Sequence, residues 1–279
     1  MIVVKIRCAA HDDHRDLLAA AVTTVVAKTA LAEKGAGSAA TDAADDDQVF
    51  ELRQYTLHRG QRDTLIALFE KSFIEPQNEH GAHILGTFRD LDDPDRFVWI
   101  RGFRDMRSRQ AALSAFYGGP VWQANRTAAN ATMLDSDNVL LLRPAALAEG
   151  FSSRVASTAG PRGVIGATIY YLGGVDVLEF THFFENALMP QLVGLGAHPL
   201  ACLVSEESPN TYTQLPIREH DRAFVWFARW PSAGAEAAFV SRFRELSGWR
   251  DSATEAVLPA LMRKPERLRL APTVRSPLH

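Results

Sequence analysis

Apolar and polar residues recur along this chain in the spacings of strands and helices. β-forming residues predominate from Val49 to Leu57, which predicts a strand that Gly60 ends. Apolar side chains then recur every three or four positions over about residues 61–77, so a helix with one apolar face is expected there. The pattern therefore opens with a strand and an amphipathic helix.

Two more strands, a helix and a closing strand complete the pattern. Strands are predicted over about residues 82–88, 97–103 and 138–143. Asp105 is placed to cap a second helix that runs to about Phe116. This β-α-β-β-α-β order is that of a ferredoxin-like unit, in which both helices cover one face of a four-stranded antiparallel sheet.

The chain contains this unit twice. The phrase FVWIRGF begins at Phe97, and the similar phrase FVWFARW begins at Phe224. Trp122 follows the first phrase at the same distance as Trp249 follows the second. Landmarks that recur in one order with one spacing indicate a tandem duplication.

The duplication predicts the fold. A sheet with helices on one face leaves its other face uncovered, and an uncovered apolar face needs a partner. We therefore predict an α+β fold, with two ferredoxin-like (βαββαβ) units packed sheet-to-sheet as an intrachain α/β barrel of the dimeric type. The aromatic phrase then occurs twice because each half of the barrel needs its own inward-facing aromatic strand.

The expected domain boundaries follow from the repeat. A first unit is predicted at 48–145 and a second, divergent unit at 164–273, with a linker at 146–163. Residues 1–47 are rich in alanine and then in small and acidic residues, which predicts a disordered or signal-like segment. Its apolar run is shorter than the roughly 20 residues that span a membrane. We expect a cytoplasmic protein; export through a degenerate N-terminal signal is the alternative.

Composition and missing motifs exclude several functions. The formal net charge is −3 over 279 residues, without a basic stripe, so nucleic acid is not an expected partner. Cys8 and Cys202 form no paired motif, and we expect no metal site and no cofactor. Dinucleotide, P-loop, serine-hydrolase and zinc-protease signatures are absent from the sequence.

At this point the residues resemble a known family. ELRQYTL, which begins at Glu51, resembles the opening strand of the NIPSNAP family, and Pro120-Val121-Trp122, after a helix that contains Arg109, resembles its closing block. The resemblance implies a dimeric α/β-barrel fold, shared with cofactor-free monooxygenases and with haem- or ligand-binding relatives. It implies little about activity.

Strand alternation selects candidates for a cavity. One face of the first strand carries Glu51, Arg53 and Tyr55, and one face of the third strand carries Phe97, Trp99 and Arg101. The opposite face of the third strand carries the slimmer Val98, Ile100 and Gly102, and slim residues suit contact with helices. We therefore assign the larger, mixed sets to the barrel interior. Glu51 and Arg53 can form a structural ion pair there, or an arginine can bind a ligand's carboxylate or enolate oxygen. Open space beside Arg53 would favour the ligand; filling by Trp99 and Trp226 would favour packing.

The second copy lacks the charged residues of the first. Alignment places Gly166, Thr168 and Tyr170 where Glu51, Arg53 and Tyr55 stand, and Ala228 where Arg101 stands. We therefore expect a single polar pocket, in the N-terminal half. The candidate ligand-binding residues are Glu51, Arg53, Tyr55, His83, Phe97, Trp99, Arg101, Tyr170 and Trp226.

The histidines admit two interpretations. His83 and His198 recur at matching places after Gly-Ala, where a duplicated turn contact or a site would explain them equally. His182, on a predicted helix of the second copy, is the one candidate for a haem ligand.

Two functions fit these observations. The first is a protein that binds a small organic ligand in a barrel cavity or serves as an interaction module. The second is a cofactor-independent monooxygenase or isomerase for an aromatic or quinol-like substrate, with Arg53 stabilising an anion and Tyr55 or His83 moving a proton. Association of whole chains into a homo-oligomer fits either function.

Overall fold

The computed structural model describes residues 47–145, 151, 163–245 and 261–279. We call residues 47–145 the first half and residues 163–279 the second half. The first half contains β1 (Val49–Leu57), α2 (Arg62–Ser72), α3 (Ile74–Glu79), β2 (His83–Asp90), β3 (Arg96–Phe103), α4 (Met106–Gly118), α5 (Pro120–Asn130), β4 (Met133–Asp135) and β5 (Val139–Pro144). The second half contains β6 (Val164–Tyr171), α7 (Val177–Phe183), the π-helical η1 (Phe184–Leu188), α8 (Met189–Gly194), β7 (His198–Ser205), β8 (Ala223–Trp230), α9 (Ala233–Glu245) and β9 (Glu266–Pro272).

Local sequence explains where the helices begin. The Asp105 side chain accepts a hydrogen bond from Ser108 N at 2.6 Å and caps α4, as predicted. Helix α4 ends at Gly118, and Pro120 is the first residue of a further helix, α5, which was not predicted. Proline is favoured at that position because its backbone lacks the N–H that the first helical turn leaves unpaired.

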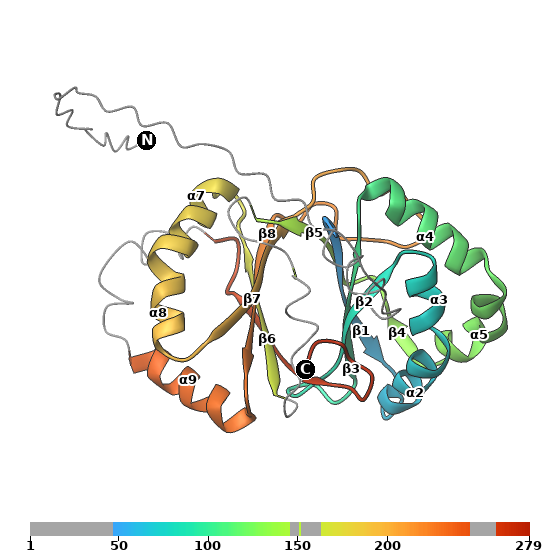
Figure 1. The fold of residues 1–279 in the computed structure, drawn as a ribbon, viewed down its shortest axis with the longest axis horizontal. Helices are drawn as coiled ribbons and strands as arrows, with labels where there is room; N and C mark the ends of the chain where they lie inside the picture. The colour runs from blue at the N-terminus through green and yellow to red at the C-terminus, as the bar shows by residue number, and fades with distance from the viewer. Residues whose placement is uncertain (1–46, 146–150, 152–162, 246–260) are drawn as a thin grey trace, which may run out of the picture. The chain divides into compact units, whose positions relative to one another are not determined.

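The strands form a closed antiparallel barrel (Figure 1). Each half-sheet has the ferredoxin-like order, β2-β3-β1-β5 in the first half and β7-β8-β6-β9 in the second. β2 pairs with β9 and β5 pairs with β7, so both edges of one half-sheet bond to the other. Eight strands of the described residues close in this way, with β4 added along β1, and the predicted intrachain barrel is confirmed.

Aliphatic and aromatic side chains from both half-sheets pack inside the barrel. The interior cluster includes Leu52 and Ile100 from the first half and Ile165 and Val225 from the second. The C-terminal segment joins it, since Leu278 packs in the cluster and its N–H donates to Leu85 O at 3.0 Å. An eight-stranded barrel is just wide enough for such side chains to fill.

The predicted assignment of the two sheet faces is wrong. Tyr55, Phe97 and Trp99 pack with residues of α2, α4 and α5 rather than inside the barrel. The slim residues Val98 and Ile100, which we expected against the helices, face the interior instead. The narrow barrel takes the slim side chains, whereas the layer between sheet and helices has room for indole and guanidinium groups. The cavity built from Glu51, Arg53 and Arg101 is therefore not a barrel cavity.

Some predictions fall outside the described residues. The N-terminal segment lies there apart from Asp47, and the linker apart from Phe151 and Gly163. Within the described part of the chain, no helix has the length and apolar character that crossing a membrane requires.

Candidate functional site

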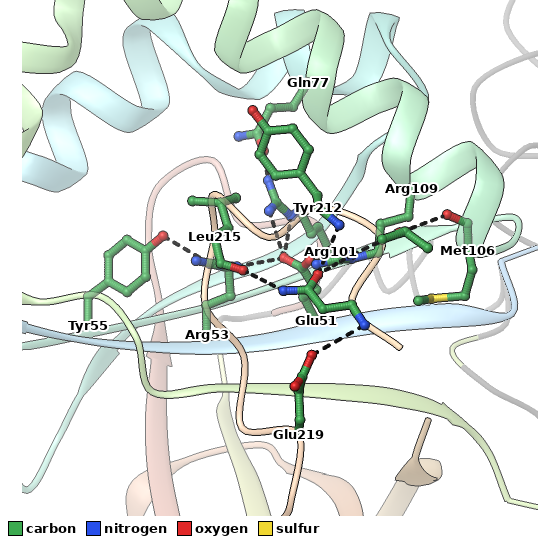
Figure 2. Close-up of polar contacts among 12 residues, drawn as sticks. Glu51, Arg53, Tyr55, Gln77, Arg101, Met106, Arg109, Tyr212, Leu215 and Glu219 are labelled. Atoms are coloured by element: carbon green, nitrogen blue, oxygen red, sulfur yellow. Dashed lines mark hydrogen bonds and ion pairs between the residues drawn. The ribbon is translucent and has the colours of Figure 1, made fainter. Parts of the chain in front are cut away.

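Three arginines bind the Glu51 carboxylate between the first half-sheet and its helices (Figure 2). Arg53 Nη1 and Arg101 Nη2 lie 2.7 Å and 2.6 Å from Oε2, and Arg109 Nε lies 2.6 Å from Oε1. β1 carries Glu51 and Arg53, β3 places Arg101 directly opposite Glu51, and α4 supplies Arg109. All four side chains are at most 1% exposed. We call these four residues the arginine cluster.

Neutral groups satisfy the outer nitrogens of two of the arginines. Arg53 Nε donates to the Tyr55 hydroxyl at 2.9 Å, and Arg101 Nη1 donates to Gln77 Oε1 at 2.6 Å. The predicted ion pair between Glu51 and Arg53 is therefore present and belongs to a larger buried network. Buried ionic groups persist in proteins when they are paired and hydrogen-bonded in this way.

The arginine cluster carries more positive than negative charge. Burial alone would raise the pKa of Glu51, but Arg101, Arg53 and Arg109 together hold that pKa well below its usual range. Burial lowers the pKa of Arg109 against the attraction of Glu51, and repulsion from Arg101 and Arg53 lowers it further. Arg109 Nη2 is buried and has no hydrogen-bond partner among the described residues. One carboxylate is thus shared by three guanidinium groups, so positive charge is in excess.

Aromatic rings fill the space beside the cluster. The guanidinium carbons of Arg53 and Arg101 lie 5.5 Å and 5.0 Å from the Trp99 ring centroid, and Phe97 packs edge-on against Phe69. Cation–π contacts of this kind stabilise desolvated guanidinium groups. The space next to Tyr55 and Trp99 has a volume of only about 30 Å³. The region around Arg53 is therefore packed rather than open.

A loop of the second half covers the cluster. This loop, residues 206–221, lies between β7 and β8, and we call it the strap. Arg109 Nη1 donates to Asn210 Oδ1 at 3.0 Å and to Thr211 Oγ1 at 3.2 Å. Tyr212 stacks on Tyr117 with their ring centroids 6.0 Å apart. The strap thus joins the two halves on the helix side of the sheet.

The histidines lie away from the arginine cluster. His83 Nδ1 is 2.9 Å from Asp47 Oδ1, and this hydrogen bond raises the pKa of His83 against the opposing effect of partial burial. His182 is exposed on α7, so it does not project into the core as a haem ligand would. Among the described residues, no three histidine, cysteine, aspartate or glutamate side chains are grouped to hold a metal ion.

The second half repeats the register of the first with smaller side chains. Glu51 pairs with Arg101 across β1 and β3, and Gly166 pairs with Ala228 across β6 and β8. In the same way, Arg53 faces Trp99, and Thr168 faces Trp226. The alignment predicted from the sequence is therefore confirmed by strand pairing. Three large charged side chains of the first half correspond to glycine, threonine and alanine.

A pocket of about 320 Å³ lies in the second half where the first half is filled. It lies on the helix side of β6, β8 and β9, against α8 and α9. Its lining residues are Thr168, Tyr170, Leu192, Trp226, Trp230, Phe239, Phe243, Lys264, Pro265 and Arg267. Tyr170 and Trp226 were predicted candidates, and the structure brings these two together. The other seven candidates lie in the first half.

The small residues of β6 shape the pocket wall. The Trp230 ring lies directly over Gly166, so close that a Cβ atom at this position would be 2.5 Å from the ring. The indole Nε1 atoms of Trp226 and Trp230 are buried and have no hydrogen-bond partner among the described residues. Burial raises the pKa of Tyr170, so its hydroxyl stays protonated near neutral pH.

The expectation of a single polar pocket in the N-terminal half is not what the structure has. We interpreted Gly166, Thr168 and Ala228 as the loss of a site. Thr168 instead lines an open pocket, whereas the Trp230 ring occupies the space over Gly166. The small size of Thr168 was the feature of the sequence that could have indicated the pocket. Phe239, Lys264 and Arg267 could not have been found in this way, because no repeat or motif marks them.

Comparisons with known proteins identify a family for the first half only. Residues 50–149 match the NIPSNAP family model. No curated protein matches the chain in sequence.

Solved structures of similar fold extend over both halves. A "putative monooxygenase" from Fusobacterium nucleatum is 9% identical with a TM-score of 0.54, covering 81% of this chain and 92% of its own. Another from Lactobacillus acidophilus is 12% identical with a TM-score of 0.50, covering 81% and 94%. An anthrone oxidase-like protein is 10% identical with a TM-score of 0.51, covering 82% and 93%. At these identities the similarity concerns the fold, and it supports the two-unit α/β barrel.

Proposed function

Because residues 50–149 belong to the NIPSNAP family and both halves together form a dimeric-type α/β barrel, we propose that this protein binds a small organic molecule. The binding site is the pocket of the second half, between the half-sheet and the helices α8 and α9. The first half has the structural role, with its equivalent space occupied by the arginine cluster. The observation that carries the proposal is the open pocket beside Thr168, at the register position where the first half has the buried Arg53.

The dimensions and the walls of the pocket support this function. Its volume of about 320 Å³ lies within the range of small-molecule sites. Trp230 packs 4.9 Å from Phe239 and 6.3 Å from Trp226, measured between ring centroids, so flat apolar surfaces surround the space. Such surfaces bind planar apolar groups of a ligand. A few polar groups among apolar walls are typical of a ligand site.

The direct test combines detection of a bound molecule with a variant that fills the pocket. Native mass spectrometry of the purified protein should show a bound small molecule, or a naphthalene probe should quench tryptophan fluorescence with saturation. Thr168→Phe should lower the affinity at least tenfold, because the new ring occupies the pocket, while the melting temperature stays near that of the wild type. Thr127→Phe, on the exposed face of α5, is the matched control and should bind normally. Equal binding by Thr168→Phe and wild type would contradict the proposed site.

Cofactor-independent oxygenation is a second candidate function. It is favoured by structural neighbours named for monooxygenase and anthrone oxidase activity, which share the fold over four fifths of this chain. The roles first given to Arg53, Tyr55 and His83 pass to groups in the pocket. Tyr170 would donate a hydrogen bond to the oxygen of a phenolate substrate, and Arg267 would stabilise the negative charge on that oxygen.

An oxygen electrode separates this candidate from simple binding. With anthrone as the test substrate, oxygen uptake above the protein-free rate is expected, and Tyr170→Phe should reduce it at least tenfold. Tyr212→Phe, in the strap, should leave the rate unchanged. Saturable binding of anthrone without oxygen uptake would reject the oxygenase and keep the binding function.

A further inference from the structure

The polar groups that line the second-half pocket are of one kind. The charged residues of the lining are Lys264 and Arg267, and both are cations. No aspartate or glutamate occurs among the described residues of the lining. The pocket therefore presents donors and cations, with the Thr168 and Tyr170 hydroxyl groups as its neutral members.

A buried carboxylate fixes one of the two cations. Glu236, on α9, is 2% exposed, and its Oε1 lies 3.3 Å from Arg267 Nη2. The same carboxylate accepts from Arg269 Nε at 2.9 Å, and Arg269 also reaches Asp92 at 2.8 Å. Glu236 is thus shared between two guanidinium groups. It holds Arg267 at the edge of the pocket, and Glu236 and Asp92 together balance the charges of the two arginines.

The second cation supplies excess positive charge. Within the described part of the chain Lys264 makes no hydrogen bond or ion pair, and it lines the pocket beside Pro265. Glu266, the nearest acidic residue in sequence, is engaged elsewhere, since it accepts from the Tyr171 hydroxyl at 2.8 Å. Two exposed cations therefore lie at the rim of an aromatic pocket, and the charge of Lys264 is not offset.

We propose that the ligand is a planar aromatic anion whose ring system lies between Trp226, Trp230 and Phe239 and whose carboxylate or phenolate is bound by Arg267 and Lys264. This inference rests on the proposed function and specifies its ligand class. An acidic group would accept from the donors and balance the charge. A cationic ligand would face two positive side chains, and a purely apolar ligand would leave both without a counter-charge.

Three probes of one shape test the sign of the charge. They are 2-naphthoate, neutral 2-naphthamide and cationic 2-naphthylmethylammonium, each titrated into the full-length protein near pH 7 with tryptophan fluorescence or calorimetry as readout. We expect 2-naphthoate to bind at least tenfold more tightly than 2-naphthamide, because charge-assisted hydrogen bonds are about twice as strong as neutral ones. The ammonium probe should not bind measurably. The 2-naphthoate affinity should fall with added salt.

Variants then locate the anion within the pocket. Arg267→Gln and Lys264→Gln should each weaken 2-naphthoate binding about tenfold, with less than a twofold change for 2-naphthamide. Arg126→Gln, on the exposed face of α5, makes the same change in net charge and should alter neither affinity. Arg267→Gln leaves Glu236 paired with Arg269, so its melting temperature should stay close to wild type.

The outcomes distinguish this inference from the function on which it rests. Equal affinities for 2-naphthoate and 2-naphthamide, both lost in Thr168→Phe, would overturn the anionic ligand and leave a binding pocket in place. Tight binding of the ammonium probe would overturn it as well. Failure of all three probes, with no small molecule in the native mass spectrum, would overturn the binding function itself.

Discussion

Ala228 occupies in the second half the position that Arg101 occupies in the first. Each lies opposite the third residue of its half's opening strand, Gly166 or Glu51. One register therefore carries a buried charge pair in one half and two small residues in the other. The first two predictions concern this contrast, and the other two concern the hydrogen bonds of His83 and of Asn210.

Removing the Glu51 charge should strongly destabilise the protein. In Glu51→Gln three buried guanidinium groups lose the carboxylate that they share, so a loss of about 3–5 kcal/mol in the free energy of unfolding is expected. Urea denaturation measures it. Asp63→Asn is the control, because the Asp63–Arg89 pair is exposed and such pairs contribute about 0–1 kcal/mol. Similar small losses in both variants would contradict a structural role for the cluster.

A methyl group at Gly166 should disturb the pocket of the second half. The Cβ atom of Gly166→Ala would overlap the Trp230 ring, so a loss of about 1–3 kcal/mol is expected together with weaker probe binding. Gly174→Ala is the matched control, since its Cβ atom would meet no other atom within 4 Å. Unfolding and probe titration of both variants give the answer. An unchanged affinity in Gly166→Ala would show that the ring position does not shape the site.

The contact between His83 and Asp47 should make stability depend on pH. The hydrogen bond that His83 donates to Asp47 raises the pKa of His83 in the folded protein above its ordinary value near 6.5. The contribution of the pair is therefore complete below that ordinary value and is lost as the pH rises through the raised pKa. His83→Gln should remove this part of the decline in urea midpoints above about pH 6.5. His58→Gln, at an exposed position, should keep it; identical profiles for all three proteins would refute the assignment.

Asn210 should hold the strap over the arginine cluster. Its Oδ1 accepts from Arg109 and from Tyr212 N, and its Nδ2 donates to Leu215 O at 2.9 Å. Asn210→Ala removes these bonds and leaves Arg109 Nη1 with Thr211 alone, so about 1–3 kcal/mol of stability should be lost. Amide hydrogen exchange should accelerate in the strap. Asn186→Ala, which removes an exposed side-chain bond to His182 O, should change neither quantity.

The strand order, the register and the closed barrel could be predicted from sequence because a duplication fixes many positions at once. Matching Leu57 with Leu172 placed Gly166, Thr168 and Tyr170 correctly, and the strand pairing agrees. The Asp105 cap could also be predicted, because capping depends on a few neighbouring residues.

The side of the sheet on which each set of residues lies, and the position of the pocket, could not be predicted from the same pattern. Alternation shows which residues share a face, but Trp99 and Ile100 are both apolar enough for either side. The choice depends on how wide the barrel is and how far the helices stand from the sheet, which are properties of the whole assembly. The pocket depends likewise on residues that are distant in sequence, such as Tyr170 and Arg267, so no local motif announces it.

The pairing of β2 with β9 has a consequence for synthesis of the chain. β9 leaves the ribosome long after β2, so the first half must wait through synthesis of the second half with β2 lacking its outer neighbour. During that interval an unpaired edge and an apolar sheet surface are open to other nascent chains, and both are known routes to mispaired assemblies. Slow elongation through the second half would lengthen this exposure and lower the yield of monomeric barrel.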